Sequence, residues 1–435
     1  MTHPWITLGL KKGLTDIEIF STRNKTMKLT VYQQSVDEFV QSDVDVTTIR
    51  GIYEGHAASV RFENKDDANV DALLDQLIAN AKAITLNEPA IIFAGSESYP
   101  EASKVPFDFS SVPTAEKIEK LKALEQRILD HEKVTQVQSS VYYEGDSTTT
   151  LINSKGLSLQ DRTTFAYAYA SAVFAEGDDI QSAYDVAMMH SFAEFDPETI
   201  AQTTIDLGVR KLGGASLPSK AYPVVFSNKM FANILGVFTT IFSGESANRN
   251  LTPLKDKVGK PIAGADIQLI DDPRHPSAFF QSRFDHEGVA TLKKQIVKDG
   301  VFQGFVHNLK TASMAGTAPT GNSFGGGISM TNFYMEPSST SFDQLLQPIE
   351  NGVYITDLVG LHAGVKTVSG EFSLQASGFK IEQGKLTTPV KMIVVSGNFF
   401  ECLNNIKGYA SDLYFNLSNI GSPSVWIDSL MIGGE

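Results

Sequence analysis

The sequence of 435 residues contains a single cysteine, Cys402. One cysteine excludes an intramolecular disulfide framework and is typical of a protein in a reducing compartment. No uninterrupted apolar run approaches the roughly 18 residues that a membrane-spanning helix needs. Residues 1–20 also lack the long apolar region of a signal peptide. We therefore expect a cytoplasmic protein that does not associate with membranes.

Histidine is scarce, and its spacing does not fit a metal-binding helix. The eight histidines, at positions 3, 56, 131, 190, 275, 286, 307 and 362, include no pair one helical turn apart. His286-Glu287 could open a His-Glu-x-x-His zinc helix, but no second histidine follows one turn later. The alternative for Asp285 and Glu287 is turn and helix-cap chemistry ahead of a hairpin. A zinc site built from residues distant in the sequence stays open at this stage.

Basic residues are outnumbered by acidic ones. The sequence has 36 Lys and Arg against 50 Asp and Glu, a net charge of −14. No basic run extends beyond pairs such as Lys11-Lys12 and Lys293-Lys294. Because nucleic-acid affinity depends largely on Lys and Arg neutralising phosphates, we expect no direct binding to nucleic acid.

The overall composition, with 42% hydrophobic and 20% charged residues, is typical of a globular protein. A chain of this length accommodates two or three domains. We predict an α+β fold with a boundary just after Gly213-Gly214. Residues 1–215 then form an N-terminal domain of mixed sheet and helices, and residues 216–435 form a β-rich domain.

Hydrophobic periodicity gives the elements of each domain. Alternation with a period of two predicts N-terminal strands at residues 26–32, 44–53, 56–62, 134–143, 147–153 and 163–175. Helical spacing predicts helices from residue 70 and at 114–131, and Asp196-Pro197 marks the start of a third. In the second domain we expect strands at residues 222–226, 289–296, 301–307, 329–334, 371–381, 390–395 and 424–431. They would form a curved or barrel-like sheet around one buried helix, at residues 228–242.

That buried helix is the most strongly patterned stretch of the chain. Ser227 can cap its first turn, and Gly244 is expected to end it. Its apolar stripe comprises Phe231, Ile234, Leu235, Phe238, Ile241 and Phe242, which is the spacing of a helix packed in a core. No ionisable side chain lies between Lys229 and Glu245, so nothing on this helix can bind a metal ion or move a proton.

A glycine-rich loop at residues 320–327 is the main candidate for a binding site. Residues 321–325 match Gly-x-Ser-x-Gly, but a β-like run follows where a nucleophile elbow needs a helix. The loop also lacks the Gly-Lys-Ser/Thr ending of a phosphate-binding loop. Such a loop can allow close approach of a neighbouring strand or of an extended peptide bound through its main chain. The candidate substrate-binding residues are Thr320, Gly321, Asn322, Gly325 and Gly326.

The order of motifs in the second half resembles that of the TldD/PmbA family, most strongly from residue 222 to 406. The motifs are Phe284-Asp285-x-Glu287-Gly288, Ile296-Val297-Lys298-Asp299-Gly300, Pro319-Thr320-Gly321-Asn322, Thr331-Asn332, Ser369-Gly370-Glu371-Phe372-Ser373, Ala376-Ser377-Gly378-Phe379, Ile381-Glu382-x-Gly384, Pro389-Val390 and Ser396-Gly397-Asn398. The resemblance implies a part in a cytosolic metallopeptidase that acts on peptides and unfolded chains. In that family, TldD-type members carry a zinc-binding His-Glu-x-x-x-His helix and a cysteine ligand near the C-terminus. TldE/PmbA-type members lack these ligands and assemble with TldD.

Alignment with the TldD pattern places the zinc helix on residues 228–242. The two histidines and the glutamate would fall at Gly236, Ile241 and Val237, and residues 420–435 contain no cysteine. The resemblance therefore implies a TldE/PmbA-type, non-catalytic subunit with no cofactor of its own, zinc being held by a TldD-like partner. A homodimer is the expected assembly when that partner is absent.

Two further functions stay open from the sequence. One is a self-sufficient peptidase with an unrecognised site, for which Ser323 or Cys402 would be the nucleophile. The other is a regulatory peptide-binding module, as the older family label "modulator of DNA gyrase" suggests. With a charge of −14, any such effect on DNA metabolism would be indirect.

Overall fold

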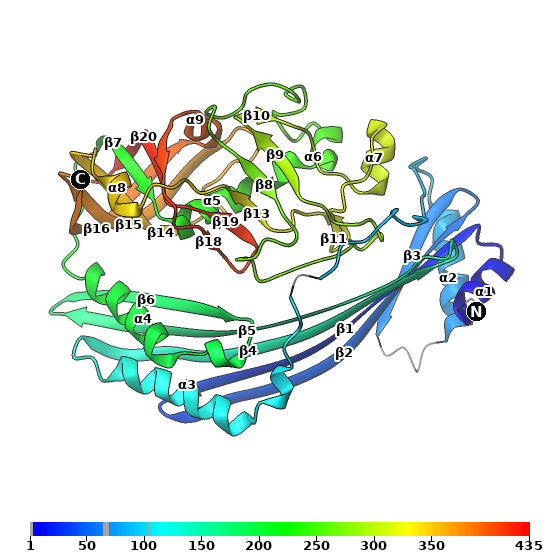
Figure 1. Ribbon diagram of the computed structural model, residues 1–435, viewed down its shortest axis with the longest axis horizontal. Helices are drawn as coiled ribbons and strands as arrows, with labels where there is room; N and C mark the ends of the chain where they lie inside the picture. The colour runs from blue at the N-terminus through cyan, green and yellow to red at the C-terminus, as the bar shows by residue number, and fades with distance from the viewer. Residues whose placement is uncertain (1–2, 64–68, 103) are drawn as a thin grey trace.

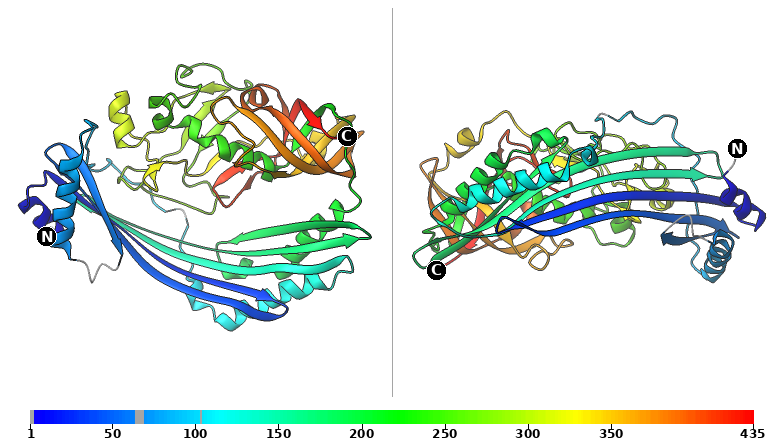
Figure 2. Two further views of the ribbon diagram at one scale, coloured as in Figure 1. Left: turned by 180° about the vertical axis from the view of Figure 1, so that it is seen from behind. Right: turned by 90° about the horizontal axis from the view of Figure 1, so that it is seen from below.

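The computed structural model describes residues 3–63, 69–102 and 104–435 (Figure 1). Its N-terminal half is built on an antiparallel six-stranded sheet of order β3-β2-β1-β4-β5-β6. The strands are β1 (Asp16–Tyr32), β2 (Ser35–Tyr53), β3 (His56–Glu63), β4 (Val134–Asn153), β5 (Ser158–Glu176) and β6 (Asp179–Met189). The long strands curl, and the concave face of the sheet lies against the C-terminal half (Figures 1 and 2).

Helices cover the convex face of this sheet. They are α1 (Pro4–Lys11), α2 (Val70–Ala83), α3 (Thr114–Leu129) and α4 (Pro197–Lys211). At one end of β1, Ile17 and Ile19 form a core with α1 and α2. At its other end, Met27, Leu29 and Val31 form a core with α3 and α4. Because alternate residues of a strand point to opposite faces, the remaining face of the sheet is free to carry polar side chains toward the C-terminal half.

The C-terminal half contains a closed barrel. Its strands follow the order β16-β15-β14-β7-β20, and pairing of β16 with β20 closes the ring, to which β17 is added at β20. These strands are β7 (Lys220–Phe226), β14 (Asn351–Val359), β15 (Glu371–Glu382), β16 (Lys385–Asn398), β17 (Ile406–Tyr409) and β20 (Val425–Gly433). The structure confirms the predicted α+β fold with its barrel-like C-terminal sheet.

A second sheet and short helices complete this half. The sheet has the order β10-β9-β8-β13-β19-β18, and β11 pairs with β12 as a separate hairpin. These strands are β8 (Leu269–Asp271), β9 (Lys294–Lys298), β10 (Val301–Phe302), β11 (Ser323–Phe324), β12 (Gly327–Ile328), β13 (Phe333–Met335), β18 (Tyr414–Phe415) and β19 (Ile420–Ser422). The helices are α5 (Asn228–Phe238), α6 (Gly244–Asn248), α7 (Leu309–Ala315), α8 (Phe342–Leu346) and α9 (Phe399–Asn404), with 3-10 turns η2 (Phe109–Ser111), η3 (Phe192–Glu194) and η4 (Thr239–Phe242).

Helix α5 packs in one core with the barrel and the second sheet. Every residue of the predicted stripe is at most 3% exposed, and Phe238 stacks on Phe399 with ring centroids 4.1 Å apart. The prediction for Gly244 was wrong, because the helix ends at Phe238, continues as η4, and Gly244 begins α6. A Cβ at Gly244 would lie 2.3 Å from Nδ1 of His307, so close packing explains this glycine.

Other differences from the predicted elements have local causes. The strands predicted at 134–143 and 147–153 are one strand, β4, because Gly145 stays paired with both β1 and β5. Of the strand predicted at 329–334, only Phe333 and Tyr334 lie in a strand, β13, since Thr331 N–H donates to the side chain of Asp271 instead of to a neighbouring strand. The predicted strands at 289–296 and 301–307 are shorter, beginning at Lys294 and ending at Phe302.

The segment at residues 87–102 contacts both halves of the chain. The side-chain amide of Asn153 on β4 donates to Phe93 O (2.7 Å), and the Tyr99 hydroxyl donates to Gly288 O (2.7 Å). The predicted domain boundary at residues 215–216 lies between α4 and β7 and stays a prediction. Within the described residues, no helix is long and apolar enough to cross a membrane.

We predict that Phe238→Ala lowers the free energy of unfolding by about 3–5 kcal/mol, because it empties a fully buried site against Phe399. Chemical denaturation followed by circular dichroism measures this. Phe39→Ala is the matched control, since Phe39 on β2 is 50% exposed and its truncation is expected to change stability by roughly 0.5 kcal/mol or less. Equal losses in the two variants would show that α5 is not a core helix.

Candidate functional site

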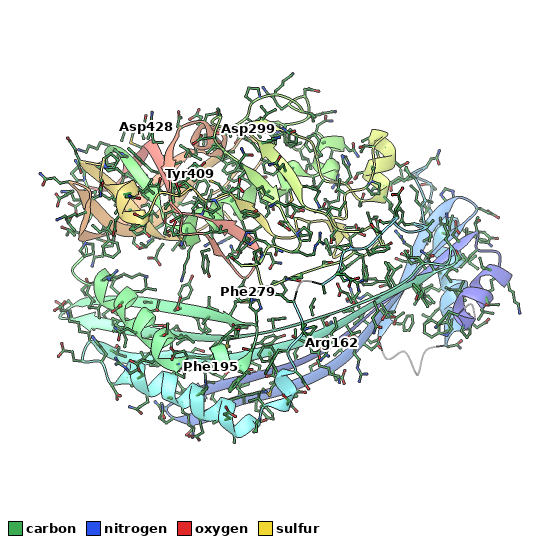
Figure 3. The ribbon with its side chains drawn as sticks, viewed as in Figure 1. Arg162, Phe195, Phe279, Asp299, Tyr409 and Asp428 are labelled. Carbon is green, nitrogen blue, oxygen red and sulfur yellow. The ribbon has the colours of Figure 1, made fainter. Side chains whose placement is uncertain are left out.

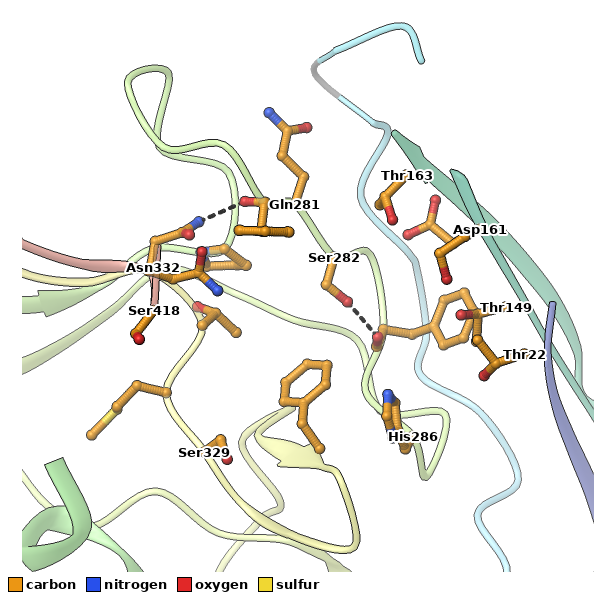
Figure 4. A pocket seen from close by; sticks show the side chains of 18 residues that line it. Thr22, Thr149, Asp161, Thr163, Gln281, Ser282, His286, Ser329, Asn332 and Ser418 are labelled. Atoms are coloured by element: carbon orange, nitrogen blue, oxygen red, sulfur yellow. Dashed lines mark hydrogen bonds between the residues drawn. The ribbon is translucent and has the colours of Figure 1, made fainter. Parts of the chain in front are cut away.

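A cavity of about 480 Å³ lies between the concave face of the sheet and the C-terminal half (Figure 4). Thr22 on β1, Thr149 on β4 and Asp161 on β5 are direct cross-strand neighbours and form one row of its floor. Ser147 and Thr163 form a second row two residues further along. The sheet therefore presents an array of hydroxyl groups, fixed in position by strand pairing.

The opposite wall carries mainly aromatic and amide side chains. It includes Phe280, Phe284, His286, Phe324, Met330 and Asn332. The ring of His286 packs against Phe20 of β1 at 4.5 Å and against Phe324 of β11 at 5.2 Å. Asn332 is 1% exposed and donates from its amide nitrogen to two backbone carbonyls, while its Oδ1 has no hydrogen-bond partner in the part of the chain that the structure describes. Asn332 lines the cavity, and this oxygen is itself buried.

The cavity is nearly uncharged. Its titratable lining residues are Asp161 and His286. Burial lowers the pKa of His286 to about 4, so the imidazole is neutral at pH 7, and its Nδ1 accepts a hydrogen bond from Gly325 N–H (3.2 Å). Burial raises the pKa of Asp161, whose carboxylate accepts backbone N–H groups of Arg162 and Arg283. Hydroxyls, amides and aromatic rings on a neutral surface suit a polypeptide main chain better than a charged ligand.

A second cavity of about 440 Å³ lies under α5 and shares Ser329, Met330 and Ser418 with the first. The helix face that lines it carries Asn233, Gly236, Val237 and Thr240, at i, i+3, i+4 and i+7. Two of the three positions that the resemblance assigned to a zinc helix, Gly236 and Val237, thus line a cavity. The third, Ile241, is 1% exposed and lies in the core.

The residues around this second cavity do not fit a zinc centre. Zinc is bound in proteins by cysteine, histidine and carboxylate side chains, and none of these types lines the cavity. Across residues 3–63, 69–102 and 104–435, no group of three or more His, Cys, Asp and Glu is placed to bind a metal ion. Cys402 is 3% exposed, and burial raises its pKa to about 12, so its thiol is protonated at neutral pH.

The glycine-rich loop forms the β11–β12 hairpin at the edge of the main cavity. Gly325 and Gly326 occupy its two turn positions with φ of 59° and 80°, as in a type I′ turn. A Cβ at either glycine would meet no atom within 4 Å. A hairpin turn therefore follows Ser323 where a nucleophile elbow requires a helix, and the Gly-x-Ser-x-Gly match has no catalytic geometry.

The other candidate binding residues of this loop make contacts within the protein. Asn322 is fully buried, and its amide nitrogen donates to the carboxylate of Asp271 and to Ser329 O, both at 2.9 Å. The Thr320 hydroxyl donates to Asn322 Oδ1 (2.8 Å). At Gly321, φ is 70° and a Cβ would lie 2.5 Å from Ala290 O. Direct contact with a substrate stays a prediction for the five residues, and Gly325 and Gly326 have the open space for it.

The motif Asp285-x-Glu287-Gly288 connects the hairpin and the N-terminal sheet. Asp285 is fully buried and accepts the backbone N–H groups of Glu287, Val289 and Ser323; burial raises its pKa to about 7. Glu287 pairs with Arg50 of β2 (3.2 Å) and accepts Leu309 N–H (2.8 Å) at the start of α7. A Cβ at Gly288 would lie 2.7 Å from a methyl group of Leu157. The motif residues position the site and do not line a catalytic centre.

Comparisons with known protein families agree with this architecture. Residues 107–212 match the central domain and residues 219–434 the C-terminal domain of the PmbA/TldA metallopeptidases. The chain belongs to the TldD/PmbA metallopeptidase family. The family resemblance inferred from the motifs is thereby confirmed, and the cleft described above is the candidate site of a member of this family.

Individual relatives cover most of the chain. It is 27% identical to the metalloprotease PmbA of Escherichia coli O157:H7 over 76% of this chain and 72% of that protein. A crystal structure from Thermotoga maritima, described as a proposed modulator of a DNA gyrase, is 27% identical with a TM-score of 0.93 over 99% and 98% of the two chains. TldE from Thermococcus kodakarensis has the same fold at 23% identity, with a TM-score of 0.90 over 99% of each chain.

We predict that acidification selectively destabilises the protein through His286. Its pKa is about 4 in the folded state and about 6.5 when unfolded, so between these values the unfolded chain binds the extra proton and stability is lost as pH falls. The stability of the wild type relative to His286→Gln should therefore fall by about 2 kcal/mol from pH 7 to 4.5. Urea denaturation of both proteins at both pH values measures their free energies of unfolding. The contributions of the other titrating groups are the same in the two proteins and cancel in the difference. A pH-independent difference would contradict a buried neutral imidazole.

Proposed function

We propose that this chain is a TldE/PmbA-type, non-catalytic subunit of a metallopeptidase whose TldD-like partner supplies the zinc ion and the general base. The observation that carries the proposal is the face of α5. Asn233, Gly236, Val237 and Thr240 line a cavity there without a single carboxylate, imidazole or thiolate. A zinc-bound water would have no ligands to hold its metal and no base to accept its proton.

The role proposed for this subunit is to enclose and align an extended peptide. The two cavities, of about 480 and 440 Å³, are joined through Ser329, Met330 and Ser418. The hydroxyl groups of Thr22, Thr149 and Thr163 on the sheet can hydrogen-bond to a peptide main chain. Recognition through the main chain depends little on side-chain identity, which suits a substrate class of peptides and unfolded chains.

The alternative of a self-sufficient peptidase has no support from geometry. A reactive cysteine needs a lowered pKa and access to substrate, whereas Cys402 is buried and its pKa is raised. Ser323 is 5% exposed and is followed by the hairpin turn. A regulatory peptide-binding module would use the same cleft, and the two tests below separate it from a peptidase subunit.

We predict that the purified chain contains far less than one equivalent of zinc. The reason is the absence of a suitable ligand set around α5 and elsewhere in the described residues. Inductively coupled plasma mass spectrometry on protein purified without chelator measures this, with a TldD-like partner prepared in parallel as the positive control. About one zinc per chain would overturn the proposal.

We also predict that the chain restores peptide cleavage when mixed with a TldD-like partner. If the hairpin contacts the peptide, Gly325→Asn should weaken cleavage by about tenfold, equivalent to 1.4 kcal/mol. Asn-Gly is a favoured type I′ turn, so this variant adds a side chain while preserving the hairpin. If the hairpin instead has a purely structural role, Gly325→Asn should leave the rate of peptide cleavage unchanged. Cleavage by the partner alone at the same rate would refute the subunit role.

A further inference from the structure

A small recess of about 50 Å³ adjoins the main cavity and shares Asp161, Thr163, Gln281 and Ser282 with it. The recess lies between the sheet, the connecting segment at Ala102 and residues 104–106, and the C-terminal loop at 274–283. Phe279 of that loop and Arg162 of β5 both line it from opposite sides of the boundary between the two halves (Figure 3). The recess is thus a side extension of the cleft.

Basic side chains gather at this recess in a protein whose net charge is −14. Lys104, Arg162, Arg274 and Arg283 line it, and Asp161 is the one carboxylate among its described lining residues. Arg162 forms a bidentate pair with Asp146. The other three cations make no ion pair with any carboxylate in the described part of the chain. Positive charge is therefore concentrated where a ligand in the cleft would reach.

Neutral acceptors position these cations. The ammonium of Lys104 contacts Nε2 of His190 at 2.9 Å and donates to Ala278 O at 2.7 Å. Arg283 donates from Nε to Pro100 O (2.8 Å), and Arg274 donates from Nη1 to Thr291 O (3.1 Å).

Burial affects the charge balance at the recess. It lowers the pKa of Lys104, and together with the charge of Lys104 it lowers the pKa of His190, whose ring stays neutral at pH 7. The charges of Glu194 and Asp272 act on Lys104 and Arg274, and Arg283 interacts with Asp161, each from beyond ion-pair distance. An anion bound here could contact the three cations directly through charge-assisted hydrogen bonds.

The size of the recess restricts the anion. A volume of about 50 Å³ is enough for one or two water molecules, and so for a carboxylate group but not for a nucleotide. Three spaces then follow one another through shared lining residues: the basic recess, the main cavity, and the cavity under α5. A peptide with its carboxylate in the recess would extend from there toward α5.

We propose that the recess lined by Lys104, Arg274 and Arg283 binds the C-terminal carboxylate of a peptide that lies in the cleft. The proposal rests on the peptide-binding role given above and adds a direction to it. The recess sets the polarity of the peptide, with its C-terminus at β5 and its preceding residues directed toward α5. Side-chain carboxylates share this chemistry, and the experiment distinguishes the two sources.

The experiment measures binding of three fluorescein-labelled octapeptides of alanine, serine and leucine to the full chain by fluorescence anisotropy at pH 7.4. One has a free C-terminal carboxylate, one has a C-terminal amide, and one has a C-terminal amide with a glutamate at the last position. The free carboxylate should bind at least about tenfold more tightly than the plain amide, because hydrogen bonds to charged groups are stronger than those between neutral groups. Lys104→Met should reduce that ratio to below about threefold.

Lys366→Met is the matched control, because Lys366 is 75% exposed, pairs with Glu371 and lies outside the recess. It should leave the ratio unchanged. Tighter binding of the glutamate peptide than of the plain amide would extend the site to side-chain carboxylates. Equal binding of the free acid and the amides would overturn the inference while leaving the peptide-binding role intact. No binding of any of the three peptides would overturn both.

Discussion

The buried carboxylate of Asp285 is the constraint on which the site depends. It accepts three backbone N–H groups, two from its own turn and one from Ser323 at the start of the β11–β12 hairpin. The same turn aims His286 into the cleft and delivers Glu287 to Arg50 on the sheet. Burial raises the Asp285 pKa to about 7, and the three hydrogen bonds oppose that shift. One side chain therefore holds together the hairpin, the cleft wall and the contact between the two halves.

Helix α5 and the turn η4 that continues it have two faces with different surroundings. The six residues of the apolar stripe are buried in the core, while Asn233, Gly236, Val237 and Thr240 face a cavity. The apolar stripe determines how this region packs in the core, and the cavity-facing residues determine which groups the cavity presents to a ligand. Of the three positions that the resemblance assigned to a zinc helix, Gly236 and Val237 lie on the cavity face, whereas Ile241 lies in the core. The high structural similarity to the Thermotoga maritima protein at 27% identity is consistent with this separation.

The sequence predicted what depends on local pattern. The α5 stripe, the strands at 371–381 and 390–395, and the β-rich C-terminal half follow from periodicity, and the structure confirms them. Strand β14 and edge strand β6 were missed, as was α1, a helix of only 8 residues. The cleft could not be predicted from the sequence, because Thr22, Thr149 and Asp161 become neighbours only through the register of β1, β4 and β5. The family motif was recognised, but not its role in connecting the two halves.

The distribution of charge links the cleft to its ligand. A net charge of −14 disfavours nucleic-acid binding, yet the cleft floor carries one carboxylate, Asp161, and the side recess is lined by four basic side chains. Exposed charges are screened beyond about 8 Å at physiological ionic strength, so the recess cannot attract a distant anion against the charge of the whole protein. In the proposed role, its cations would act on a carboxylate that has already entered the cleft. The neutral walls would therefore govern which chains enter, and the basic recess would govern the direction in which they lie.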